Sequence, residues 1–343
     1  MIYPKSLALG GTIGFPAPSF GCATQPYKAA FEHALEKWES MGYKTQPGPN
    51  AWVEQGVGIS NTPEKCAHEF MDMYLSKESD CLISCGGGEL MCEILPYLDF
   101  TRLAQAKPKW FMGYSDNTNL SFLLATLIDT ASVYGPCAGS FGMEPLHVSL
   151  TDAFEILTGK RTHVESYGMW EKDSLKDPED PLVPYNLTEE LDMKCFVGLE
   201  RSDTAQFHGR LLGGCLDVLA NLVGTRFDRV TEFVENYRED GIIWFLEACD
   251  LNVFSIRRAM WQLEEAGWFQ HVKGFLFGRP ANCDPMMNLD TCGAVMEVAG
   301  RKNVPVVLDA DIGHRPPMMP LVVGSMADVK FSGNHLAVDM QYC

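Results

Sequence analysis

The chain is 343 residues long, carries a formal net charge of -18, and is 46% hydrophobic and 21% charged. A length above the roughly 100–200 residues of one domain predicts two domains, and this balance of apolar and charged residues excludes a disordered chain. The negative charge argues against nucleic acid or an anionic membrane surface as a partner, because neutralising phosphates requires a basic patch.

The first residues favour a strand and a turn over a targeting segment. Gly10, Gly11 and Pro16 interrupt the short apolar run, whereas a signal peptide needs a longer one and a small-residue cleavage site. No stretch approaches the about 20 apolar residues of a membrane span. The 12 cysteines are scattered singly without a CxxC pair, which favours reduced, buried thiols in a cytoplasmic protein.

Strands and helices alternate through the first part of the chain. Apolar residues recur at helical spacing in 27–41, and Thr62-Pro63 opens a second helix with the proline in its first turn. We further expect strands at 7–13, 80–85 and 109–113, a helical stretch after the second of these, and a helix at 117–129. This alternation predicts an α/β fold with a parallel sheet covered by helices on both faces.

The pattern fades from about 151 to 194, where the sequence is rich in charge and proline and predicts a linker or mobile loop. Beyond it we expect a glycine-rich turn and helix at 208–223, strands at 242–246, 274–277 and 304–308, helices at 253–266 and 289–301, and antiparallel strands within 321–340. The predicted organisation is an N-terminal domain at 1–165, a linker or active-site loop at 166–195, and a C-terminal domain at 196–343.

The first candidate for chemistry is Ser115, in the segment GYSDNT. A bend between the strand-like run before it and the helix-like run after it would present the hydroxyl where open α/β sheets place their ligands. Gly113 precedes the serine as in a Gly-x-Ser-x-Gly elbow, but Asn117 stands at the place of the second glycine. A helix starting here would aim backbone N–H groups at an oxyanion, whereas an ordinary helix N-cap is the alternative.

A glycine-rich loop, SCGGGEL, follows the strand predicted at 80–85. Gly86 and Gly87 would let the backbone approach a ligand closely, as in an oxyanion hole completed by the backbone N–H of Asp116. A dinucleotide-binding loop is a second interpretation, although the Gly-x-Gly-x-x-Gly spacing is missing. A plain tight turn is the third.

Two further residues are candidates for a base and its partner. Glu247 ends an apolar run, IIWFLE, which is typical of a buried strand, where a carboxylate is costly without a partner. A histidine is one suitable partner, and an arginine or a cluster of backbone N–H groups is another. His314 follows a strand and a glycine and precedes prolines that would hold its loop rigid. The order Ser, Glu, His, each at a strand end, is the arrangement of a Ser-His-acid triad.

Together these stretches resemble the LD-carboxypeptidase family of serine peptidases, which includes the microcin C self-immunity peptidases. The matching segments span nearly the whole chain in the family's order: LGGTIGFPAPS, GYSDNTNLSFLL, YGP, GRLLGGCLDVLANLVGT, FLEACD, GFLFGR and DIGHRPPMMPLVVG. Two positions depart from the family pattern. Gly10 stands where an aspartate is frequent, and Arg315 stands where a small polar residue is common.

The resemblance implies a nucleophile at Ser115, a general base at His314 and an orienting acid at Glu247. It implies oxyanion donors from the backbone of Gly87 and Asp116, and no metal or cofactor. It also implies a flavodoxin-like N-terminal domain, a smaller α/β C-terminal domain, an active site in the cleft between them, and a homodimer. Arg315, beside the base, would alter substrate choice or supply a cation for a carboxylate.

The resemblance leaves two substrate classes, because one branch of the family trims murein tetrapeptides and the other cleaves the amide of aminoacyl-nucleotide conjugates. The chain length and the middle loop look more like the second branch, and Trp170 would stack on a nucleobase unless it is a partly buried loop aromatic. A non-catalytic ligand-binding protein on the same scaffold is the alternative. An NAD-dependent dehydrogenase is a more distant one, since Asp99 lies too early and Asp116 too late to bind the ribose.

Overall fold

The computed structural model describes residues 1–282 and 284–342, and its internal contacts divide the chain into two compact units. The first unit comprises Met1–Arg161 and Asp173–Asn186, and the second comprises Thr162–Lys172 and Leu187–Tyr342. The chain therefore crosses between the units three times. These crossings fall within or just before 166–195, where the sequence predicts a linker or loop.

The strands of the first unit form a parallel sheet, which confirms the α/β fold class. Neighbouring strands pair in the order β5-β4-β3-β1-β2, and all four pairings are parallel. The strands are β1 (Thr12–Phe15), β2 (Lys44–Pro47), β3 (Cys81–Ile83), β4 (Trp110–Gly113) and β5 (Ser132–Tyr134). Since β3, β4 and β5 are buried throughout, the segments that follow them start from fixed points.

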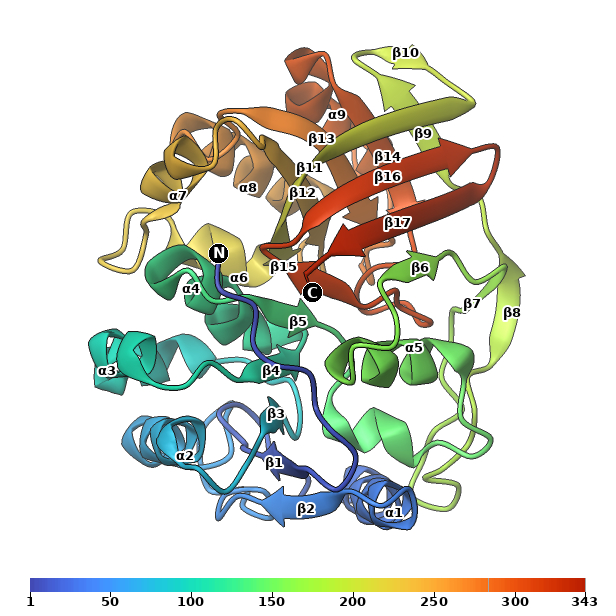
Figure 1. Ribbon diagram of the computed structural model, residues 1–343. Helices are drawn as coiled ribbons and strands as arrows, with labels where there is room; N and C mark the ends of the chain where they lie inside the picture. The colour runs from blue at the N-terminus through green and yellow to red at the C-terminus, as the bar shows by residue number, and fades with distance from the viewer. Residues whose placement is uncertain (283, 343) are drawn as a thin grey trace. The chain divides into compact units, whose positions relative to one another are not determined.

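Helices cover both faces of this sheet, with α2, α3 and α4 on one face and α1 and α5 on the other (Figure 1). Local sequence signals set their ends: the Thr62 side chain accepts the backbone N–H of Lys65, and Pro63 is the first helical residue of α2. The helices are α1 (Tyr27–Ser40), α2 (Pro63–Leu75), α3 (Phe100–Gln105), α4 (Thr118–Ile128) and α5 (Val148–Leu157), with short 3-10 helices η1 (Met91–Tyr97), η2 (Ser115–Asn117) and η3 (Ala138–Gly142).

The second unit is built on a mixed sheet in the order β10-β9-β14-β13-β12-β11-β16-β17-β6. Its centre is parallel and consists of β11 (Thr204–Cys215), β12 (Ile242–Glu247), β13 (Val272–Gly278) and β14 (Pro305–Ala310). Antiparallel strands flank it: β6 (His163–Glu165), β9 (Lys194–Val197), β10 (Glu200–Arg201), β16 (Met326–Ser332) and β17 (His335–Gln341). The predicted antiparallel strands near the C-terminus are thus confirmed. Outside this sheet lie β15 (Leu321–Val323) and the antiparallel pair β7 (Met169–Glu171) and β8 (Leu187–Glu190).

Helices gather on one face of the central strands of this sheet (Figure 1). Beneath them the core contains Trp244 and Trp268, which are fully buried and stack at 5.9 Å between ring centroids. The helices are α6 (Leu216–Leu222), α7 (Val230–Asn236), α8 (Val253–Glu265) and α9 (Thr291–Ala299), followed by the 3-10 helix η4 (Gly300–Lys302).

Three expectations from the sequence are wrong in detail. The stretch 151–194 is not devoid of regular structure, because it holds the end of α5 and the strands β6, β7 and β8, which are too short to show a readable periodicity. The predicted glycine-rich turn from 208 is the second half of β11. Its Gly213 allows close pairing, since a Cβ there would clash with the carbonyl of Phe245. The first strand also begins at Thr12 rather than at residue 7.

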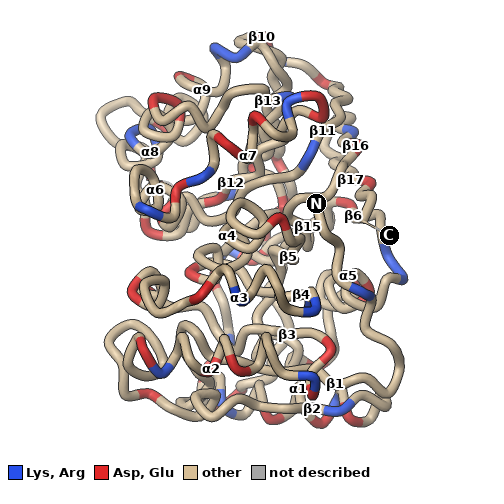
Figure 2. The backbone as a smooth tube through the Cα atoms, turned by 60° about the vertical axis from the view of Figure 1, so that its left-hand side comes forward, with Lys and Arg blue, Asp and Glu red and all other residues tan. Residues whose placement is uncertain are grey.

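Acidic residues recur along the chain in both units, interspersed with basic ones (Figure 2). Across residues 1–282 and 284–342, no helix combines the length and apolar character needed to span a membrane.

Candidate functional site

Ser115 lies on a strained bend between β4 and α4. The strand ends at Gly113, the short helix η2 begins at Ser115, and α4 follows from Thr118. Ser115 adopts φ 62°, a left-handed conformation that disfavours a side chain, and its backbone N–H donates to the Tyr134 hydroxyl at 3.3 Å. Strain of this kind clusters at functional sites, and it presents a half-buried side chain at the strand end.

The predicted glycine loop lies directly beside this serine. A Cβ built on Gly87 would lie 3.3 Å from Cβ and 3.4 Å from Oγ of Ser115. The backbone of the loop therefore faces the hydroxyl with no side chain in between. The carbonyl of Gly86 accepts Nδ2 of Asn117 at 2.8 Å. Asn117, at the place of the second glycine of an elbow motif, thus fastens the loop to the bend.

Asp116 has a buried side chain and a backbone N–H at the start of η2. The first N–H groups of a helix lack partners within the helix, which suits the predicted role as an oxyanion donor. Its carboxylate is 3% exposed and accepts Oγ of Ser19 at 2.6 Å and the backbone N–H of Met91 at 2.9 Å. Burial raises the pKa of this carboxyl to about 6, although these hydrogen bonds favour the ionised form.

In the second unit, Glu247 and His314 form a buried acid–base pair. Glu247 is the last residue of β12 and is fully buried, and its Oε2 lies 2.8 Å from Nδ1 of His314. The imidazole itself is 15% exposed. A carboxylate on Nδ1 holds the proton there and leaves Nε2 as the basic nitrogen.

Two glycines make room for the Glu247 side chain. Gly313, with φ 95°, runs so close to this carboxylate that a Cβ would overlap it. A Cβ on Gly278 would clash with the carbonyl of Ile312 and lie 3.1 Å from Cβ of Glu247. Both positions therefore require glycine for space, and Gly313 requires it for conformation as well.

The surroundings of His314 favour its protonated form. Burial acts to lower the pKa of the ring, but the charge of Glu247, a hydrogen bond with the Cys249 side chain and the hydrogen bond with Glu247 outweigh it. The pKa of His314 is consequently raised well above 6.5. A base of this kind is strong once it is neutral, which requires a pH above the ordinary range of histidine.

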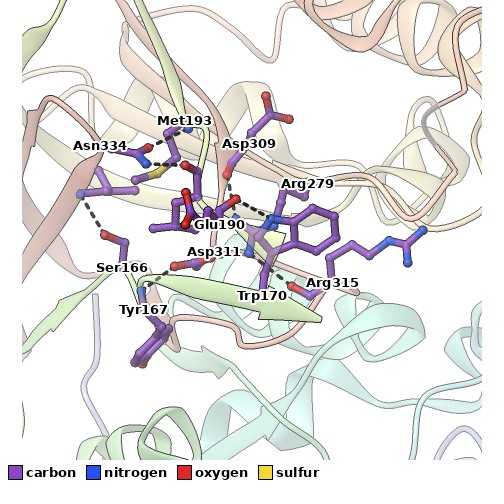
Figure 3. Close-up of polar contacts among 12 residues, drawn as sticks. Ser166, Tyr167, Trp170, Glu190, Met193, Arg279, Asp309, Asp311, Arg315 and Asn334 are labelled. Atoms are coloured by element: carbon purple, nitrogen blue, oxygen red, sulfur yellow. Dashed lines mark hydrogen bonds and ion pairs between the residues drawn. The ribbon is translucent and has the colours of Figure 1, made fainter. Parts of the chain in front are cut away.

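A buried ion pair that the sequence reasoning missed holds the loop of His314 (Figure 3). Nη2 of Arg279 pairs with Oδ1 of Asp311, and both side chains are almost completely buried. The same guanidinium donates to the carbonyls of Asp309 at 2.9 Å and Arg315 at 3.4 Å, and Oδ2 of Asp311 accepts the N–H of Tyr167 at 2.7 Å. The feature of the sequence that could have predicted this pair is the arginine directly after the buried strand GFLFG.

We expect Arg279→Met to destabilise the chain strongly. It leaves the Asp311 carboxylate buried without its cation, which costs about 3–5 kcal/mol. Urea unfolding followed by circular dichroism measures this. The control is Arg301→Met, which breaks an exposed pair with Glu297 and should cost less than about 1 kcal/mol. Equal losses of unfolding free energy in the two variants would show that the buried pair contributes no more to stability than the exposed one.

Trp170 and Arg315 lie near this ion pair (Figure 3). Trp170 is in β7 rather than in an irregular loop, its Nε1 donates to the carbonyl of Glu190 at 3.1 Å, and the guanidinium of Arg279 lies 5.2 Å from its ring centroid. Arg315 donates to the carbonyls of Lys172 and Ala281, the latter at 2.7 Å. Its guanidinium is thus bound to backbone oxygens.

The structure accordingly gathers the predicted residues into two groups. In the first unit, Gly87 lies against Ser115, Gly86 is bonded to Asn117, and Asp116 follows the serine in the chain; in the second, Glu247 contacts His314, with Arg315 next in the chain. Within residues 1–282 and 284–342, no group of three or more His, Cys, Asp or Glu side chains is placed to hold a metal ion.

Comparison with known proteins gives consistent matches along the chain. A model of the LD-carboxypeptidase N-terminal domain matches residues 13–135, and a model of the LD-carboxypeptidase C-terminal domain matches residues 208–329. The microcin C7 self-immunity protein MccF of Escherichia coli is 28% identical over 344 residues, which cover 98% of this chain and 95% of that protein. The probable murein peptide carboxypeptidase of Bacillus subtilis is 26% identical, with coverage of 94% and 90%.

Solved structures agree with this assignment. The wild-type apo structure of MccF aligns with a TM-score of 0.82 at 25% identity, over 100% of this chain and 99% of that one. MccF in complex with glutamyl sulfamoyl guanosine aligns with the same TM-score and coverage at 24% identity. The two domain models together match most of the chain, one over the segment of Ser115 and the other over those of Glu247 and His314. The protein therefore belongs to the LD-carboxypeptidase family of peptidases.

Proposed function

We propose that this protein is a serine-type amide hydrolase with Ser115 as nucleophile, His314 as general base and Glu247 as orienting acid. The observation that carries the proposal is the 2.8 Å hydrogen bond between Nδ1 of His314 and the buried carboxylate of Glu247. The strained backbone of Ser115 and the glycine loop against its side chain support the serine as the third member.

Catalysis requires Nε2 of His314 to meet the Ser115 hydroxyl. The imidazole takes the hydroxyl proton as Oγ attacks the scissile carbonyl, and the backbone N–H groups of Gly87 and Asp116 stabilise the oxyanion, each by about 3 kcal/mol. The imidazolium, stabilised by Glu247, then protonates the leaving amine, and an acyl-enzyme remains. Water attacks the ester by the same route, which releases the carboxylic acid and restores Ser115.

We infer that the substrate is an aminoacyl-nucleotide conjugate. The relative MccF is named as a self-immunity protein for microcin C7, and MccF structures hold glutamyl sulfamoyl guanosine and aspartyl sulfamoyl adenosine. The base would stack on the half-buried ring of Trp170, beside the guanidinium of Arg279, which lies 5.2 Å from the ring centroid. A murein tetrapeptide is the second candidate, which the Bacillus subtilis relative supports.

Mass spectrometry after incubation with each substrate tests this choice. We expect aspartyl sulfamoyl adenosine to yield aspartate and sulfamoyl adenosine. Trp170→Ala should raise KM for this conjugate about tenfold through the lost stacking, whereas Trp261→Ala, at an exposed tryptophan on α8, should not change it. Release of D-alanine from a murein tetrapeptide, with the conjugate intact, would assign the protein to the murein branch.

Labelling by a serine-directed phosphonate separates an enzyme from a binding protein. Modification of Ser115 supports the hydrolase, and an inert protein that cleaves neither substrate would be a non-catalytic binder. We also propose, from the family resemblance, that the protein acts as a homodimer in the cytoplasm, and light scattering of the purified protein tests the dimer.

A further inference from the structure

The carboxylate of Asp116 connects three segments around Ser115. Its Oδ2 accepts Oγ of Ser19 at 2.6 Å and the backbone N–H of Met91 at 2.9 Å, and its Oδ1 accepts Nδ2 of Asn119 at 3.1 Å. Ser19 follows β1, Met91 begins η1 after the glycine loop, and Asn119 lies in the first turn of α4. One side chain therefore fixes all three segments to the residue next to the serine.

The glycine loop is held at its middle and just beyond its end. Beyond the loop, Met91 is bonded directly to Asp116. Within the loop, the N–H of Phe20 donates to the carbonyl of Gly87 at 2.7 Å, and Phe20 is the neighbour of Ser19. A Cβ on Gly88 would clash with Oγ of Ser19, so the loop packs directly on the hydroxyl that Asp116 binds. Through Ser19 and Met91, the contacts of the Asp116 carboxylate thus reach both sides of Gly87.

An ionised carboxylate suits this position better than any neutral side chain. Three donors converge on its two oxygens at a site that is 3% exposed. An asparagine would turn an NH₂ group toward donors on one side, and a buried donor without an acceptor costs about 1–3 kcal/mol.

We propose that the Asp116 side chain is a positioning residue, which holds residues 86–91 at the distance from Ser115 that oxyanion stabilisation needs. The inference rests on the proposed function, since it assumes that Ser115 is the nucleophile. It goes beyond the backbone role of Asp116, because it assigns the carboxylate a separate task.

Protonation of the carboxylate weakens this connection. Burial raises its pKa to about 6, the charge of Glu89 raises it further, and the donors Ser19, Met91 and Asn119 lower it. A further titratable neighbour is Cys92 on η1, whose own pKa is raised first by burial and then by Asp116. Below about pH 6 the group gains a proton, and one of its acceptor positions becomes a donor. Activity then depends on a second proton besides that of His314.

The rate of labelling of Ser115 by a serine-directed phosphonate, measured from pH 5 to 9, tests the proposal without knowledge of the natural substrate. We expect Asp116→Asn to slow labelling about 100-fold and Ser19→Ala about tenfold, as for small misplacements of catalytic groups. Below pH 6 the logarithm of the rate should fall with a slope near two in the wild type and near one in Asp116→Asn. Ser132→Ala, which also removes a buried hydroxyl with one hydrogen bond, should label within about twofold of wild type.

Thermal unfolding of each variant shows whether it is folded. If Asp116→Asn does not fold, the labelling rate of Ser19→Ala alone tests the proposal. Wild-type labelling rates in Ser19→Ala and a folded Asp116→Asn, or a slope of two that persists without the carboxylate, would overturn the proposal. Failure of the proposed function is distinguishable, because then either Ser115→Ala would cleave substrate like the wild type, or the wild type itself would cleave neither substrate and resist the phosphonate. An inert Ser115→Ala beside unaffected Ser19 and Asp116 variants would reject this inference alone.

Discussion

Ser115→Ala is expected to lower kcat by about a millionfold, as loss of a serine nucleophile does elsewhere. The alanine keeps the bend between β4 and α4 but has no oxygen to attack a carbonyl. Substrate binding should persist, since the substitution leaves the glycine loop and the ring of Trp170 unchanged. Single-turnover assays measure the rate, and isothermal titration with uncleaved conjugate measures the affinity.

The backbone conformation of Ser115 suggests a second variant as a control. Because φ is 62° at this residue, alanine keeps a strain of about 1 kcal/mol that glycine relieves. Ser115→Gly should therefore be as inactive as Ser115→Ala but more stable to urea. Turnover by either variant above about 1% of the wild-type rate would exclude Ser115 as the nucleophile, for which essentially complete loss is expected.

Glu247→Gln should reduce kcat about 10⁴-fold, because the amide no longer fixes the imidazole tautomer or stabilises the imidazolium. It should also change the pH profile. His314 must be neutral to accept a proton, so in the wild type kcat/KM falls as the pH drops through the raised pKa of His314. Removal of the charge that raises this pKa should move the fall to lower pH.

A matched control separates this effect from the general cost of losing a buried carboxylate. Glu69 of α2 is also buried and accepts the N–H groups of Ala17 and Asn50 at 2.9 and 2.7 Å. Glu69→Gln should destabilise the chain yet leave the acidic limb of the pH profile in place. If Glu247→Gln leaves that limb where it is, Glu247 does not set the basicity of His314.

Helices and strands with a capping residue or a long apolar pattern of their own can be predicted from the sequence. Thr62-Pro63 marks the start of α2 because a hydroxyl cap and a proline suit only a first turn. The parallel sheet follows from buried apolar runs that alternate with helical ones. The three-residue strands β6 and β7 escape prediction, since their form depends on pairing with β17 and β8 rather than on their own residues.

The candidate site divides in the same way. The sequence points to Ser115, Glu247 and His314 because each reactive group follows a predicted strand. It does not reveal the partners of Arg279 or Asp116, whose contacts join residues far apart in the chain, such as Arg279 with Asp311 and Asp116 with Ser19. Those contacts arise from the register of strands and the course of loops, which no local pattern specifies.

Gly278 and Gly313, which enclose Glu247, show that a residue can be indispensable while contributing no functional group at all. A Cβ at position 313 would overlap the Glu247 carboxylate, and one at position 278 would clash with the carbonyl of Ile312 and crowd Cβ of Glu247, so two missing side chains constrain the chemistry as much as the reactive atoms do. A comparison of homologues that considers only acids, bases and nucleophiles would miss both glycines. A homologue that retains the serine, acid and histidine but has lost either glycine should be regarded as a relic rather than as a working enzyme.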